Sequence, residues 1–157
     1  MYVYLDFIMH LICLISLSLV RILIFSIYSF DVGQGRLKDV VQEWVGVPIE
    51  QTDMYGVRRY ETGARLLTHV DRITTHAVSL IVNIAQGNLT APWTVEVYDH
   101  ANRLHEVVME PGDIVYYESA KSLHGRNAPL AGGYYANIFT HYRPSAFVFS
   151  SCIALQF

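Results

Sequence analysis

Two residues of the stretch THVDR, His69 and Asp71, are the first in the chain whose types and spacing could do chemistry. They lie in ARLLTHVDR (64–72), which reads as a β-strand, and positions i and i+2 of a strand point to the same face. Burying a histidine and a carboxylate together is costly unless a partner compensates them, and a divalent metal does so directly. Taken alone, the pair is better explained as a surface strand pair or as a buried histidine satisfied by the carboxylate. A metal site needs a third ligand from elsewhere in the chain.

The best candidate for the third ligand is His124, in SLHGR (122–126). This segment follows the turn EPGD and the strand candidate DIVYYES (113–119), and a jelly roll brings a late strand back beside an early one. Two histidines and one carboxylate on one side of a metal, with the other positions open, are typical of non-haem Fe(II) oxygenases. His124 together with the H-x-D pair therefore predicts an iron site.

Several motifs occur in the order that a known enzyme family shows: H-x-D, then the PGD turn, then ESA, then HGR. Residues 55–144 resemble the catalytic domain of the prolyl 4-hydroxylase-like, Fe(II)- and 2-oxoglutarate-dependent dioxygenases. The resemblance implies a double-stranded β-helix (a jelly roll of the cupin kind) with His69, Asp71 and His124 as iron ligands. It also implies 2-oxoglutarate and O2 as cosubstrates, ascorbate as reductant, and hydroxylation of an unactivated C–H bond, for example in a peptidyl proline.

The chain departs from this family where the cosubstrate carboxylate is bound. Prolyl 4-hydroxylases place a lysine about ten positions after the second histidine, where this chain has Tyr134, and a tyrosine three positions before the first, where it has Leu66. Arg126 follows His124 by two positions on the same strand face, and its planar guanidinium can hold a carboxylate with two hydrogen bonds. We expect Arg126 to replace the lysine, Tyr134 or Tyr60 to add a hydroxyl, and Asn83 to face the iron.

The elements that must position these residues are short and rich in β-formers. Turn residues separate eight strand candidates: 55–61, 64–72, 76–85, 93–99, 104–110, 113–119, 122–126 and 133–143. Strands at this rhythm predict a mainly β sandwich or barrel of the jelly-roll and cupin kind. Before them, DVGQGRLKDVVQEWVGVP has apolar residues at helical spacing and then Gly46 and Pro48, which predicts one short amphipathic helix.

The N-terminal run IMHLICLISLSLVRILIFSIY (8–28) is long and apolar enough for a helix that spans a bilayer. We expect a membrane anchor there; a signal peptide and an aberrant start are the alternatives. Arg36 and Lys38 favour a cytosolic domain, whereas the glycosylation sequon at Asn88 would suit a lumenal one in the endoplasmic reticulum. The expected organisation is 1–30 anchor or signal, 31–54 helix and lead-in, 55–144 dioxygenase domain, and 145–157 apolar tail.

Composition excludes several classes of function. The net charge of −3, with Lys and Arg scattered singly, argues against a nucleic-acid surface. No P-loop, C-x-x-C or Ser-His-Asp order is present, and the two cysteines cannot build a disulfide framework. His10, His76, His100, His105 and His141 are expected to be ordinary surface or supporting residues. Two rival hypotheses stay open: a degenerate cupin-like binding module without turnover, and a small membrane protein whose soluble part mediates interactions.

Overall fold

The computed structural model of the protein describes residues 35–145. The expected N-terminal apolar helix (8–28) and nearly all of the apolar tail lie outside this range. Within the range, no helix is long and apolar enough to cross a membrane. One helix and eight strands make up the described chain: α3 (Arg36–Val45), β1 (Ile49–Glu61), β2 (Leu66–His69), β3 (Val78–Gly87), β4 (Val95–Tyr98), β5 (Leu104–Val107), β6 (Ile114–Tyr117), β7 (His124–Arg126) and β8 (Tyr134–Pro144).

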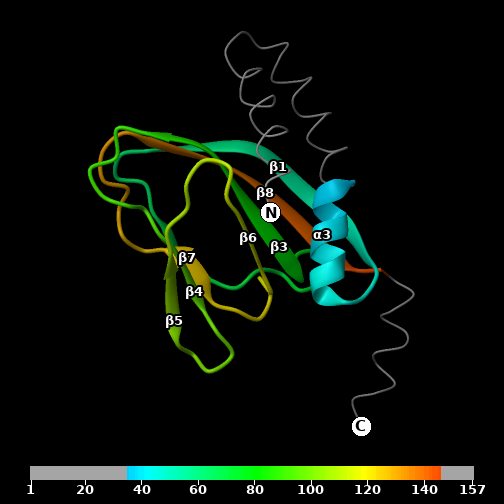
Figure 1. Ribbon diagram of the computed structural model, residues 1–157. Helices are drawn as coiled ribbons and strands as arrows, with labels where there is room; N and C mark the ends of the chain where they lie inside the picture. Colours follow the sequence, from blue (N-terminus) through cyan, green and yellow to red (C-terminus); the bar gives the residue numbers. More distant parts are fainter. Residues whose placement is uncertain (1–34, 146–157) are drawn as a thin grey trace.

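The strands form two four-stranded antiparallel sheets, in the orders β1-β8-β3-β6 and β2-β7-β4-β5. Figure 1 shows the first sheet between α3 on one side and β4, β5 and β7 on the other. The connections repeatedly cross from one sheet to the other, which is the arrangement of a jelly roll. The prediction of a mainly β, jelly-roll-like fold with a short amphipathic helix is confirmed.

Helix α3 covers the outer face of the first sheet. Leu37 and Val41, one turn apart on the helix, pack with Leu80 of β3 and Tyr142 of β8. The helix ends at Gly46, which has a left-handed backbone (φ 72°) and donates its N–H to the carbonyl of Gln42 at 2.9 Å. This is the stop that the sequence predicts.

The inner face of the first sheet looks towards the second sheet. Phe139 of β8 and Ile81 of β3 are paired across the strands and pack with Val95 of β4. Because side chains alternate along a strand, Tyr135 and His141 lie on the same inner face as Phe139, near the two ends of β8. The space between the sheets is thus lined by polar residues at both ends and by apolar ones in the middle.

All eight predicted strands are present, but two strand boundaries differ from the prediction and change the placement of residues 49–54 and of Asp71. Residues 49–54 belong to β1 rather than to the lead-in of the helix, because they pair with the end of β8 across two irregularities. Strand β2 ends at His69, so Asp71 lies in the loop that follows and not on the strand.

Candidate metal and cosubstrate site

The three predicted ligands, His69, Asp71 and His124, meet at one end of the space between the sheets. His69 and His124 face each other across the pairing of β2 with β7, and their ring centroids are 4.4 Å apart. Asp71 Oδ1 lies 3.6 Å from Nε2 of His69 and 4.0 Å from Nε2 of His124. Although Asp71 is off the strand, its N–H donates to the carbonyl of Ser119 at 2.8 Å, which holds the loop in place. The structure therefore brings the three side chains together.

In both histidines, a backbone carbonyl accepts a hydrogen bond from the Nδ1 side of the ring. Nδ1 of His69 lies 2.8 Å from the carbonyl oxygen of Leu67, and Nδ1 of His124 lies 2.9 Å from that of Ser122. A carbonyl only accepts, so each Nδ1 carries the hydrogen and each Nε2 keeps its lone pair for a metal. Burial lowers the pKa of His124, which favours the neutral imidazole that a metal needs.

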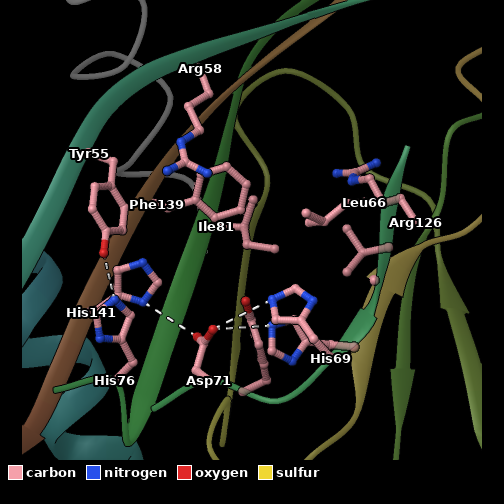
Figure 2. Close-up of a pocket in the computed structure, with 14 residues that line it drawn as sticks. Tyr55, Arg58, Leu66, His69, Asp71, His76, Ile81, Arg126, Phe139 and His141 are labelled. Carbon is pink, nitrogen blue, oxygen red and sulfur yellow. Dashed lines mark hydrogen bonds and ion pairs between the residues drawn. The ribbon is translucent and has the colours of Figure 1, made fainter. Parts of the chain in front are cut away.

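A cavity of about 150 Å³ opens above these ligands. Figure 2 shows Tyr55, His76 and His141 on one side of it, Leu66 and Arg126 on the other, and Arg58 near Phe139. Apolar side chains, among them Ile81, Val95 and Phe139, line the middle. Tyr117 lies with its ring centroid 4.6 Å from that of His124.

Arg126 lies at the end of the cavity away from Asp71 and is only 2% exposed. Its guanidinium carbon lies 4.4 Å from the ring centroid of Trp93 and 4.5 Å from that of Tyr135, and these two rings meet edge to face. Nη1 donates to the carbonyl of Trp93, whereas Nη2 has no hydrogen-bond partner in the structure of residues 35–145. Burial lowers its pKa, but an arginine remains charged. A buried cation with a free donor is a site for an anion.

The other three residues predicted to bind the cosubstrate, Tyr60, Tyr134 and Asn83, do not all lie near Arg126. Tyr60 is close to Arg126: its ring packs on Trp93 at 5.1 Å, and its buried hydroxyl has no partner within the described chain. Tyr134 lies on the opposite face of β8, against Arg59. The phenol beside Arg126 is that of the next residue, Tyr135.

Asn83 is fully buried on β3 but does not line the cavity. Its Nδ2 donates to Oε1 of Gln86 at 3.0 Å and to the carbonyl of Met109 at 3.2 Å. It therefore joins β3 to the chain near Met109, which is the backbone-binding role that an asparagine inside a sheet often has.

Sequence reasoning did not identify a polar cluster behind Asp71. Ser79, Ser119 and His141 come from three separate segments, and all three are buried. His141 stacks on His76 with ring centroids 3.9 Å apart, and burial lowers the pKa of His141 to about 3, so its imidazole is neutral. The alternation of side chains along β8 could have indicated the position of His141, because it puts His141 on the same face as Phe139.

Gly125 lies between His124 and Arg126 and allows β2 to approach β7. A Cβ on this residue would lie 2.8 Å from the carbonyl oxygen of Leu66 and 2.9 Å from Thr68 Cα. We predict that Gly125→Ala displaces β2, lowers the free energy of unfolding by about 1–3 kcal/mol and weakens Co(II) binding, because His69 moves with the strand. Chemical denaturation and Co(II) titration measure the two effects.

Gly46→Ala is the matched control for this prediction. Its site is strained, with φ at 72°, but has no atom within 4 Å of the added Cβ and lies at the end of α3. It should cost stability without changing Co(II) affinity. An unchanged Co(II) affinity in Gly125→Ala would contradict the prediction.

Comparison with known proteins places this geometry in context. No family model and no curated protein sequence matches the chain. Among solved structures, HygX from Streptomyces hygroscopicus with nickel and 2-oxoglutarate bound matches with a TM-score of 0.59 and 15% identity, over 77% of this chain and 68% of HygX. A prolyl-4-hydroxylase from Pseudomonas putida matches with a TM-score of 0.55 and 19% identity, over 70% of this chain and 61% of that enzyme.

The chain has the fold of 2-oxoglutarate- and iron-dependent oxygenases. AviO1 from Streptomyces viridochromogenes Tue57 shares this oxygenase fold, with a TM-score of 0.56 and 17% identity, over 70% of this chain and 57% of AviO1. The resemblance seen in the motifs is thus confirmed for the fold. The chain spans between 57% and 68% of the length of these three proteins.

Proposed function

We propose that the protein is an Fe(II)- and 2-oxoglutarate-dependent oxygenase that hydroxylates an unactivated C–H bond. The observation that carries the proposal is the pairing of two features in one cavity. Three potential ligand atoms lie within 4.8 Å of one another at one end, and a buried arginine with a free donor lies at the other. The oxygenase fold supports the same assignment.

The residues present fit a divalent iron. Two neutral imidazoles and one carboxylate form the 2-His-1-carboxylate set that non-haem Fe(II) oxygenases use, and this set leaves coordination positions open. The Nε2 atoms of His69 and His124 are the free nitrogens of their rings, because each Nδ1 donates to a carbonyl. When bound, the iron supplies the oxidising chemistry, with O2 and the keto acid as co-reactants.

Arg126 would bind the far carboxylate of 2-oxoglutarate. Its Nη1 donates to the carbonyl of Trp93, and Nη2, which has no hydrogen-bond partner within residues 35–145, is a donor for a ligand. The Tyr60 hydroxyl, which also lacks a partner within residues 35–145, could donate to the same carboxylate. Contacts with the rings of Trp93 and Tyr135 and the bond to the Trp93 carbonyl restrict the guanidinium, so its position is largely set before the cosubstrate arrives.

The apolar wall of the cavity would reduce the amount of water around the reacting groups. Ile81, Val95 and Phe139 line the middle of the cavity, between the ligand end and Arg126. A dry cavity strengthens the attraction between the guanidinium and a carboxylate, and it protects a reactive oxidant from water.

A peptidyl proline is the substrate class that the resemblance to prolyl 4-hydroxylases supports. The fold itself is compatible with others, since HygX has been crystallised with hygromycin B. Substrate trials therefore begin with proline-containing peptides and include hygromycin B as a second class.

The test uses the 157-residue chain, Fe(II), ascorbate and 2-oxoglutarate, and measures succinate with and without each candidate substrate. Anaerobic titration with Fe(II) and then 2-oxoglutarate gives an independent readout, the visible absorption band of a keto acid chelated to iron. We expect both the band and succinate. Absence of Fe(II) binding would refute the proposal, and binding without succinate would favour a degenerate cupin-like module.

A further inference from the structure

The two oxygens of Asp71 face different surroundings. Oδ1 points towards the Nε2 atoms of His69 and His124, at 3.6 and 4.0 Å. Oδ2 lies on the other side, 3.3 Å from the hydroxyl of Ser79 and 3.7 Å from Nδ1 of His141. Figure 2 shows this division, with dashed lines from Asp71 to histidines on both sides. One oxygen is available to a metal, and the other is engaged by the protein.

The group that engages Oδ2 is a buried chain of hydrogen bonds. The Ser79 hydroxyl lies 2.6 Å from Nδ1 of His141 and 2.6 Å from the hydroxyl of Ser119, whose single proton has two acceptors within reach, the Ser79 oxygen and the carbonyl of His76 at 2.7 Å. When Ser79 donates its single proton to Oδ2 of Asp71, which can only accept, Nδ1 of His141 is the group that donates to the Ser79 oxygen.

The sheet holds this chain rigidly. Ser79 of β3 and His141 of β8 are direct partners in the antiparallel register, so their side chains lie next to each other on the inner face. Behind His141, the His76 ring stacks at 3.9 Å, and Nε2 of His76 lies 2.9 Å from the Tyr55 hydroxyl. The imidazole of His141 cannot rotate away from Ser79 without breaking this stack.

We propose that Ser79 and His141 are positioning residues that keep Asp71 a one-oxygen ligand by holding Oδ2 away from the metal. The inference rests on the proposed function, because it concerns the same metal site. A carboxylate whose second oxygen is released can turn and bind a metal through both oxygens. That would use a position that a keto acid and O2 need. Ser79 and His141 therefore act on cosubstrate binding through Asp71 and do not touch the cosubstrate.

The test uses Co(II) in place of iron, because its visible absorption reports coordination number. The variants are Ser79→Ala and His141→Leu, which remove the donors, and His141→Asn, whose side-chain amide can replace the Nδ1 donor. We expect Ser79→Ala and His141→Leu to bind Co(II) with a shifted spectrum and to weaken 2-oxoglutarate binding to the Co(II) form by about 10- to 100-fold. His141→Asn should recover most of the wild-type spectrum and affinity.

His100→Leu is the control, since His100 is an exposed histidine that pairs with Glu118. Thermal unfolding identifies any variant that does not fold; if Ser79→Ala fails, the comparison of His141→Leu with His141→Asn decides alone. Wild-type spectra and 2-oxoglutarate affinity in the folded variants would overturn the inference and leave the proposed function intact. Failure of the wild-type chain to bind Co(II) would overturn both.

Discussion

His124→Ala lowers the affinity for Fe(II) or Co(II) by at least about 100-fold and abolishes succinate formation. His124 is 3% exposed, and its Nε2 is one of three potential ligand atoms that lie within 4.8 Å of one another. The substitution removes a nitrogen ligand but leaves the carbonyl of Ser122 and the pairing of β7 with β4 unaltered. We therefore expect the fold to persist and the metal to be lost.

Isothermal titration with Co(II) measures the loss, and circular dichroism shows that the sheets remain. His105→Ala is the matched control: His105 lies on β5, its side chain is 57% exposed, and it pairs with Asp99. That variant should bind metal as the wild type does. If His124→Ala and His105→Ala bind Co(II) equally well, the cluster is not the metal site.

Arg126→Gln raises the 2-oxoglutarate concentration needed for half-saturation by at least about 30-fold, which corresponds to about 2 kcal/mol. Removing the guanidinium takes away the charge and the unpartnered Nη2 donor, whereas Co(II) affinity should be nearly unchanged because Arg126 lies at the other end of the cavity. Titration of the Co(II)-loaded protein with 2-oxoglutarate measures the effect directly.

Arg126→Lys should restore little of this affinity. A lysine has no planar guanidinium to lie against the rings of Trp93 and Tyr135, and its donors all radiate from one nitrogen and not from a planar fork. Arg103→Gln, at an arginine with a 75% exposed side chain, is the control. Equal losses of metal and 2-oxoglutarate affinity in Arg126→Gln would mean that Arg126 has a purely structural role.

The ligand cluster could be predicted from the sequence because its signals are local. His69 and Asp71 are two residues apart, and His124 and Arg126 follow a recognisable turn and strand. The rhythm of turn residues also predicted all eight strands. The residues of a short motif can be identified even when the predicted strand boundaries are slightly wrong. Asp71 is an example, because it lies beyond the end of β2.

The remaining parts of the site depend on register, which local patterns do not determine. Tyr134 and Tyr135 are neighbours, and a shift of one residue decides which of them faces Arg126. Ser79, Ser119 and His141 are brought together only by the pairing of β3 with β8 and by the chain after β6. No spacing in the sequence relates them, so the support behind Asp71 became visible only in the folded chain.

Strand β7 places His124 and Arg126 on one face, with a single glycine between them. The Cα atoms of two such residues on a strand are roughly 7 Å apart, a separation that the backbone geometry fixes. If the iron is bound at His124 and the far carboxylate of 2-oxoglutarate at Arg126, this short strand sets the distance that the cosubstrate must span. We therefore expect a dicarboxylate one carbon shorter or longer than 2-oxoglutarate to bind more weakly.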